Sequence, residues 1–372
     1  MCGIVGGVSH RYVTPILLEG LRRLEYRGYD SSGVAVLDDQ GTLVRVRRKG
    51  KIRELEEALN HSPAQGRVGI AHTRWATHGV PSERNAHPHL CRNFVAVVHN
   101  GIIENHEALR SELEKKGYVF ESETDTETIV HLINEYLEGG LSLLDAVRSS
   151  CDRLEGAYAI GVVSTGAPGT LITARHGSPL VIGLGEGENF IASDIFALVG
   201  ETQRFVFLED GDLAELTTDK VRIVGRDGVP VERPVHETGL AADAVERGEY
   251  RHYMQKEIHE QPEAIRKTLE GRLGADQVLD AAFGPSASAA FDGVRAVQIV
   301  ACGTSYHAGM VARYWMEDIG GIPCSVEVAS EFRYRRHVVV PGTLFVTISQ
   351  SGETADTLAA LKEAKSLGYS HT

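Results

Sequence analysis

The sequence predicts two successive domains, an α+β domain followed by an α/β domain with a doubly wound parallel sheet. Up to about residue 225, several strand patterns follow one another without a helix between them, which indicates sheets with antiparallel pairs. Beyond about residue 250, apolar strands alternate with helices, which is typical of a parallel sheet. A charged stretch without strand patterning lies between them, so we place the domains at 1–240 and 249–372, with a linker at 241–248.

The predicted elements of the first domain are defined by turn residues and by helix-capping residues. A helix is expected over 14–28, with Thr14 as its N-cap and Pro15 at its first helical position. Three further helices that end at glycine are expected over 105–117, 124–140 and 142–156. Strand patterns bounded by Gly, Asp and Asn occur at 4–8, 33–39, 67–75, 94–101, 157–164, 170–177 and 204–217.

The second domain repeats one strand–loop–helix design. The apolar strand "RAVQIVA" runs into the loop "CGTS" and then into a helix over 306–320. The strand "TLFVTI" runs into "SQSGETADT" and a helix over 355–368. The chain ends at "GYSHT", where a third strand is expected, so we expect an incomplete sheet and a fragment of a longer protein.

Composition excludes several classes of protein. The chain has 372 residues, of which 42% are hydrophobic and 24% are charged, as in an ordinary globular protein. A net charge of −13 argues against nucleic-acid or anionic-membrane partners, which need a basic face. No apolar run reaches transmembrane length, no secretory signal is present, and the five cysteines are too far apart for a disulfide framework, so a cytoplasmic protein is expected.

The chain opens with "MCGIVGG", which allows two interpretations of Cys2. The cysteine could simply fill space at the start of a strand, as buried cysteines often do. Alternatively, removal of Met1 would make Cys2 the N-terminal residue, with a thiol nucleophile and an amine base on one residue.

Three charged or amide groups in the first domain are candidates for the same site. Arg74 lies in an otherwise apolar strand, and a buried guanidinium needs a carboxylate, either internal or from a ligand. Asn100 and Gly101 could supply donors to an oxyanion or could form an ordinary Asn-Gly turn. Asp125 precedes a helix, where a carboxylate often has only a capping role.

Four histidines, at positions 72, 78, 87 and 99, lie in or beside strands and raise the question of a metal site. Their spacing matches no zinc pattern, and no pair of cysteines accompanies them. For His72 and His89, a hydrogen-bonded, partly buried imidazole is the favoured interpretation.

The motifs "CGIVG", "YRGYDSSG", "HTRWATHG", "HNGIIEN" and "ESETDTE", in this order, resemble the glutamine amidotransferases of the N-terminal-nucleophile class. "HTRWATHG" resembles the glucosamine-6-phosphate synthase branch of that family. The resemblance covers the first domain and implies a four-layer αββα fold. It also implies that Cys2 attacks the side-chain amide of glutamine, with its own α-amino group as base and with Asn100 and Gly101 as the oxyanion hole.

The resemblance assigns further roles around the glutamine substrate. Arg74 would bind its α-carboxylate and Asp125 its α-ammonium group. Thr77 and His78 would line the pocket. Arg27 would order the closed site, and Trp75 would gate the exit of ammonia.

The loops "CGTS" and "SQSGETADT" gather hydroxyls and backbone N–H groups at helix N-termini, which suits a phosphate, although either could be an ordinary strand-to-helix turn. Neither matches an ATP or dinucleotide loop. Together with "YRHYMQKEIHEQP" and "EVASEFRYR", they resemble the sugar-isomerase (SIS) domain of the same synthase branch. The implied sugar-phosphate residues are Cys302, Thr304, Ser305, Ser349, Gln350, Ser351 and Thr354.

The two resemblances together imply an aminotransferase of amino-sugar biosynthesis. It would hydrolyse glutamine and pass the ammonia to fructose 6-phosphate, without metal or organic cofactor, in a homodimer of the full-length protein. The family's remaining isomerase residues do not occur here, so this chain is expected to support only the glutaminase half. The alternatives are a glutaminase that supplies another acceptor, and a catalytically idle module that binds a sugar phosphate.

Overall fold

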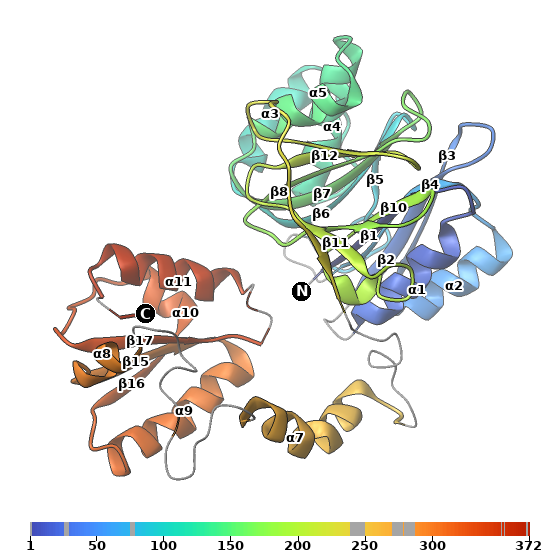
Figure 1. The fold of residues 1–372 in the computed structure, drawn as a ribbon. Helices are drawn as coiled ribbons and strands as arrows, with labels where there is room; N and C mark the ends of the chain where they lie inside the picture. Colours follow the sequence, from blue (N-terminus) through green and yellow to red (C-terminus); the bar gives the residue numbers. More distant parts are fainter. Residues whose placement is uncertain are drawn as a thin grey trace. The chain divides into compact units, whose positions relative to one another are not determined.

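The structure is a computed structural model that describes residues 2–25, 30–74, 79–238, 250–269, 278, 287–350, 352, 354–369 and 371–372. The chain divides into two compact units, Met1–Gly248 and Glu249–Thr372 (Figure 1). Each unit has its own sheets and its own hydrophobic clusters.

The first unit contains two antiparallel sheets. The strands of the eight-stranded sheet are, in spatial order, β14 (Val235–Glu237), β11 (Arg204–Phe207), β9 (Val181–Leu184), β10 (Glu188–Ala192), β1 (Gly3–Ser9), β4 (Val68–Arg74), β2 (Ser31–Leu37) and β3 (Leu43–Lys49). Those of the six-stranded sheet are β13 (Val221–Val224), β12 (Leu213–Leu216), β8 (Leu171–His176), β7 (Gly156–Ser164), β6 (Val95–Ile103) and β5 (His89–Cys91).

These sheets face one another across a buried cluster. Ile4 and Ile70 of the larger sheet share this cluster with Val98 and Val163 of the smaller one. Helices cover the two outer faces. They are α1 (Thr14–Leu24), α2 (Ile52–His61) and the 3-10 helix η2 (Ile195–Ala197) on the larger sheet, and α3 (His106–Lys115), α4 (Thr126–Glu138) and α5 (Leu143–Cys151) on the smaller one.

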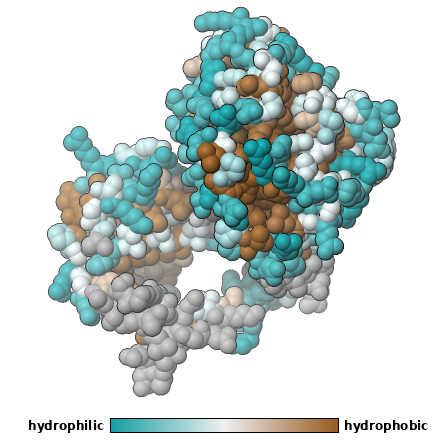
Figure 2. Space-filling view, turned by 45° about the horizontal axis from the view of Figure 1, so that its top comes forward, coloured by the Kyte–Doolittle hydropathy of each residue, from teal (hydrophilic) through white to brown (hydrophobic). Residues whose placement is uncertain are grey.

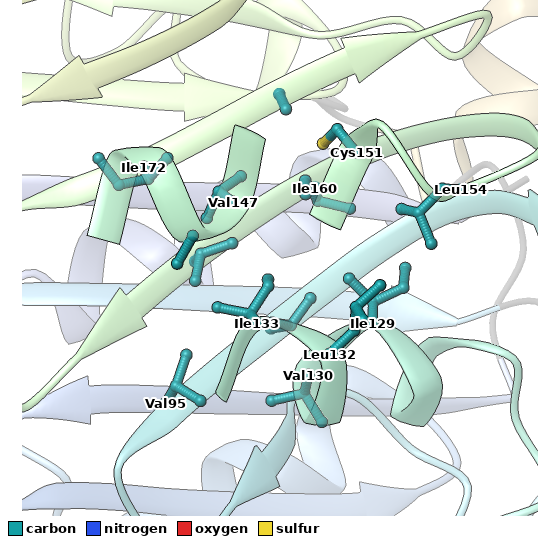
Figure 3. Close-up of a cluster of buried hydrophobic side chains, with 14 of the residues drawn as sticks. Val95, Ile129, Val130, Leu132, Ile133, Val147, Cys151, Leu154, Ile160 and Ile172 are labelled. Carbon is teal, nitrogen blue, oxygen red and sulfur yellow. The ribbon is translucent and has the colours of Figure 1, made fainter. Parts of the chain in front are cut away.

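Figure 3 shows Ile129 and Ile133 of α4 and Val147 of α5 packed with Ile160 and Ile172 of the smaller sheet. The resulting order of layers, helix, sheet, sheet and helix, confirms the α+β four-layer αββα prediction.

Two local predictions were wrong. α1 already includes Thr14, so its N-cap is Val13, and the Thr14 hydroxyl donates a hydrogen bond to the Ala64 carbonyl. The segment 204–217 is not one strand: β11 lies in the larger sheet and β12 in the smaller one. The turn between them depends on Asp212, whose buried carboxylate accepts hydrogen bonds from the Glu209 N–H and from Arg233.

The second unit contains a parallel sheet in the order β16 (Cys324–Val328), β15 (Ala296–Ala301) and β17 (Thr343–Ile348). One face is covered by α9 (Gly303–Asp318), whose Gly309 lies against Ile299 and Val326. The other is covered by α10 (Ala329–Tyr334) and α11 (Ala355–Ser366). Two further helices are α7 (Tyr253–Leu269) and α8 (Ala287–Asp292). Helices on both faces confirm the doubly wound prediction.

The third strand of this sheet is not where the sequence predicted it. β16 at Cys324–Val328 was missed, although its apolar residues alternate with Ser325 and Glu327, which was a usable signal for a strand. At the end of the chain, His371 forms a parallel bridge to Leu344, on the side of β17 away from β15.

The surface mixes hydrophilic and apolar residues, and Figure 2 shows apolar side chains among hydrophilic ones on both units. In the second unit, the exposed apolar residues include Val311, Tyr314 and Trp315 of α9. None of the helices in the described parts of the chain combines the length and apolar content needed to cross a membrane.

Candidate active site

The polar residues of the first domain lie where the apolar core between the two sheets ends. Side chains alternate between the two faces of a strand, so His72 and Arg74 share a face of β4 with Ile70. By the same rule, Asn100 shares a face of β6 with Val98. Ile70 and Val98 both belong to the intersheet cluster, so the three polar side chains extend that cluster at its end.

Cys2 lies at this same end. It is partly buried and stands two residues before Ile4, another member of the intersheet cluster. β1 pairs with β4 so that Gly3 is opposite Thr73, which brings the start of the chain beside the end of β4. The Asn100 Nδ2 donates a hydrogen bond of 3.2 Å to the Cys2 carbonyl oxygen. The first residues of the chain are therefore joined to the opposite sheet.

Asn100 and Gly101 do not form a turn, because β6 continues through them to Ile103 and pairs with β7 along its whole length. Gly101 has a φ of 135°, and a Cβ there would lie 1.9 Å from the Ala157 carbonyl oxygen. Only glycine fits this backbone. The strand thereby keeps an irregular backbone next to the Asn100 carboxamide.

The carboxamide of Asn100 is also held at its oxygen. His72 Nε2 lies 2.9 Å from Asn100 Oδ1, and both side chains are buried. Burial lowers the pKa of His72 to about 3, although the hydrogen bond to Asn100 acts in the opposite direction. The imidazole is therefore neutral at neutral pH.

Arg74 is buried and has an internal carboxylate close by. Its Nη1 lies 3.6 Å from Asp30 Oδ1, and its Nη2 donates a hydrogen bond of 3.1 Å to the Gly79 carbonyl. The Asp30 N–H in turn donates to the Arg74 carbonyl at 2.7 Å. One of the two partners considered from the sequence, the internal carboxylate, is therefore present.

Asp125 is buried just before α4 but, within the described residues, does not cap that helix with its side chain. Its Oδ2 accepts a hydrogen bond of 2.9 Å from the Ile103 N–H, at the end of β6. His99, on the same strand, lies 2.9 Å from Thr126 Oγ1 and 4.0 Å from Asp125 Oδ2. The carboxylate is thus fixed to the strand that carries Asn100.

Three of the histidines form a buried cluster. The rings of His72 and His87 are 4.2 Å apart, and those of His87 and His89 are 4.9 Å apart. Burial also lowers the pKa values of His87 and His89 well below the usual range. In the parts of the chain that the structure describes, no three His, Cys, Asp or Glu side chains form a group that could hold a metal ion.

The residues of the second domain gather at one edge of its sheet. Ala301 and Ile348, the last residues of β15 and β17, are paired, so the loops that follow them lie side by side. The helices after these loops, α9 and α11, cover opposite faces, which makes this edge the topological switch point of the sheet.

Six sugar-phosphate candidates are described at this edge. Ser349 Oγ lies 3.3 Å from Thr354 Oγ1 and accepts a hydrogen bond of 3.0 Å from the Gly352 N–H. Thr357 Oγ1 lies 4.0 Å from Cys302 Sγ, which connects the two loops. The other candidates are Thr304 and Ser305, in the first turn of α9, and Gln350, which is exposed.

Five predicted site residues lie outside the described residues: Arg27, Trp75, Thr77, His78 and Ser351. Two residues were not assigned to the site from the sequence. Asp30 belongs to the "YRGYDSSG" motif, and His72 lies two residues before Arg74, on the same face of the strand. That period-2 spacing was a usable signal for His72.

Comparison with protein families places two domains on the chain. Residues 72–200 match a glutamine amidotransferase domain, and residues 293–370 match a SIS domain. The chain therefore matches a glutamine amidotransferase domain and, further along, a SIS domain.

Over nearly its whole length, the chain is similar in sequence to proteins named isomerizing glutamine–fructose-6-phosphate aminotransferases. It is 63% identical to the protein of that name from Pseudomonas syringae pv. tomato, and 61% identical to that from Pseudomonas aeruginosa, each over 369 residues and 99% of this chain. The corresponding Shewanella oneidensis protein is 58% identical over 372 residues and 100% of this chain. The chain spans 60% or 61% of the length of these relatives.

Solved structures with the same fold include the glutamine phosphoribosylpyrophosphate amidotransferase of B. subtilis. It has a TM-score of 0.55 and 22% identity, over 87% of this chain and 65% of that one. An allosteric regulatory enzyme of purine biosynthesis has a TM-score of 0.55 and 23% identity, over 94% of this chain and 69% of that one. At this identity, the likeness concerns the fold.

Proposed function

We propose that the chain hydrolyses glutamine at Cys2, and that the whole protein passes the ammonia to fructose 6-phosphate to give glucosamine 6-phosphate and glutamate. The name of the relatives, glutamine–fructose-6-phosphate aminotransferase, supports both substrates. The observation that carries the glutaminase half is the hydrogen bond from Asn100 Nδ2 to the Cys2 carbonyl, which brings a side-chain donor to the nucleophile.

The reaction begins after removal of Met1, which leaves Cys2 with a free α-amino group. An amine of pKa about 8 has about a tenth of its population as free base at pH 7 and can take the thiol proton, whereas a lysine amine of pKa about 10.4 has less than about a thousandth. The sulfur attacks the amide carbon of glutamine, the α-ammonium group passes the proton to the amide nitrogen, and ammonia leaves as the thioester forms. Water then attacks the thioester, which releases glutamate and the thiol.

The charge that develops on the amide oxygen needs donors. An Asn carboxamide has two N–H bonds, so Asn100 Nδ2 keeps one for the oxyanion while the other points to the Cys2 carbonyl. The Gly101 N–H is the second donor. Each such donor contributes about a hundredfold to a thousandfold in kcat.

The groups that hold glutamine are of opposite charge. Arg74 pairs with its α-carboxylate, because the planar guanidinium suits a carboxylate, and Asp125 pairs with its α-ammonium. Thr77 and His78 line the pocket, Arg27 orders the closed site, and Trp75 gates the exit of ammonia.

The second domain binds the phosphate of fructose 6-phosphate at the switch point. Two helix N-termini and a set of hydroxyls meet there, which suits a phosphate. The residues proposed for this site are Cys302, Thr304, Ser305, Ser349, Gln350, Ser351 and Thr354. We expect the whole protein to be a cytoplasmic homodimer without nucleic-acid or membrane partners.

The test is covalent labelling with a diazoketone analogue of glutamine, followed by intact mass and peptide mapping, with Cys2→Ala as the matched control. The expected result is loss of Met1 and one adduct on Cys2, absent from the control. A chain that retains Met1, or an adduct spread over Cys91, Cys151, Cys302 and Cys324, contradicts the mechanism. That outcome favours an idle module that only binds a sugar phosphate.

A further inference from the structure

We propose that His72 is a positioning residue of the Cys2 site, which holds the Asn100 carboxamide with its nitrogen toward Cys2 through an N–H on Nε2. This inference rests on the proposed glutaminase function, because it explains how one oxyanion donor is kept in the productive orientation. His72 itself touches neither the nucleophile nor, in this proposal, the substrate.

An Asn carboxamide can be turned by 180° with little change in shape, so its orientation must come from its neighbours. Here both ends are fixed. Oδ1 lies 2.9 Å from His72 Nε2, and Nδ2 lies 3.2 Å from the Cys2 carbonyl oxygen. A turned carboxamide would place Oδ1 against that carbonyl oxygen, and two acceptors at this distance repel each other. It would also replace an oxyanion donor by an acceptor.

The tautomer of His72 follows from the same contacts. A proton on Nε2 is donated to Asn100 Oδ1, whereas Nδ1 is buried and makes no hydrogen bond of ordinary geometry within the described structure, although the His99 backbone lies near the ring. A proton on Nδ1 would lack a well-aligned acceptor and would leave the Nε2 lone pair facing Oδ1. Each unsatisfied buried group costs about 1–3 kcal/mol, so the Nε2–H form is favoured.

The surroundings keep this ring neutral. It packs at a tilt of 36° against His87, and the charges of Arg74 and of a protonated His99 disfavour a positive charge on it, although the His99 backbone acts in the opposite direction. Burial is the largest cause of its lowered pKa of about 3. A neutral ring has one N–H, and the geometry commits that N–H to Asn100.

The discriminating variants are His72→Gln and His72→Asn in the 372-residue chain. A glutamine amide reaches the position of Nε2 and can still donate to Asn100, whereas the shorter asparagine amide cannot. For H72Q, we expect kcat for glutamine hydrolysis to stay within about fivefold of the parent value. For H72N, we expect kcat to fall about 10–100-fold, which is less than the fall of about 100–1000-fold caused by removing an oxyanion donor altogether. KM for glutamine should change less than about threefold in both, because the lost interaction acts in the transition state.

Two controls separate positioning from folding. His131→Asn removes another buried histidine, which packs on Phe120 at 4.6 Å, and should leave kcat unchanged. In an Asn100→Ala background, H72N should lower kcat by less than about twofold further, since the residue that it positions is gone. Equal losses in H72Q and H72N, or losses that add to that of N100A, would overturn the proposal.

A second measurement does not depend on activity. The ¹⁵N spectrum of labelled histidine, with the His72 signals assigned by their absence in H72Q, should show a neutral Nε2–H ring that does not titrate between pH 8 and 5. An Nδ1–H ring, or titration near the ordinary pKa of about 6.5, overturns the proposal even if the parent chain is active. If the parent chain hydrolyses no glutamine although the His72 ring carries its proton on Nε2, the proposed function is wrong, but the contact by which His72 orients Asn100 is confirmed.

Discussion

At the scale of single residues, the backbone of Gly101 and the carboxamide of Asn100 are tightly constrained parts of the proposed site. The Ala157 carbonyl leaves no room for a Cβ at position 101, and His72 and Cys2 contact the Asn100 carboxamide. We therefore expect position 101 to tolerate substitution no better than position 100.

Gly101→Ala is therefore expected to lower the free energy of unfolding by at least about 2 kcal/mol and to abolish labelling of Cys2. The cost combines a left-handed backbone with a methyl group placed 1.9 Å from a carbonyl oxygen. Urea unfolding measures it. The control is Gly169→Ala, since Gly169 has a φ of 85° but no atom within 4 Å of a Cβ there. Equal losses in the two variants would contradict the explanation.

At the scale of elements, the connection between β11 and β12 is one of those that carry the chain from one sheet to the other. Asp212 is the residue that holds this crossing. Its two carboxylate oxygens accept hydrogen bonds of 2.8 Å from Arg233, and Oδ2 also accepts one of 2.8 Å from the Glu209 N–H. The side chain is 2% exposed, so its removal leaves Arg233 without its buried partner.

Asp212→Ala is expected to lower the free energy of unfolding by about 2 kcal/mol, because it removes a buried carboxylate that accepts hydrogen bonds from Arg233 and from the Glu209 N–H. The matched control is Glu209→Ala, whose carboxylate lies 3.1 Å from the same arginine but is 68% exposed. It should cost less than about 1 kcal/mol. Thermal and urea unfolding of both variants test this difference, and a similar effect in each would refute the structural role of Asp212.

At the scale of the whole molecule, each unit is built around its own hydrophobic clusters. Three clusters belong to the first unit, and two smaller ones belong to the second. The residues proposed for glutamine hydrolysis all belong to the first unit.

A chain of residues 1–240 is therefore expected to fold cooperatively and to be labelled at Cys2 at the rate of the 372-residue chain. Its four-layer core is complete without the second unit. The free energy of unfolding of the fragment should therefore agree within about 1 kcal/mol with that of the first unit in the longer chain. Circular dichroism with urea and the labelling rate provide the measurement. A fragment that is unfolded, or folded but unlabelled, would show that the second unit is needed.

Local patterns in the sequence predicted much of this architecture. The alternating apolar strands, the helices that end at glycine, and the change of pattern near residue 240 depend on neighbours in the chain, so a linear sequence displays them. The two loops at the sheet edge were predictable for the same reason, because the carboxyl ends of parallel strands meet at one edge.

The sequence by itself determined the two-domain order, many of the helices and strands, and the candidate residues Cys2, Arg74, Asn100 and Asp125. Only the tertiary structure decided that 204–217 is shared between two sheets, that Asp30 accompanies Arg74, and that His72 contacts Asn100. These outcomes depend on which strands face one another. That choice is made by burial between residues far apart in the chain, for which local periodicity carries no information.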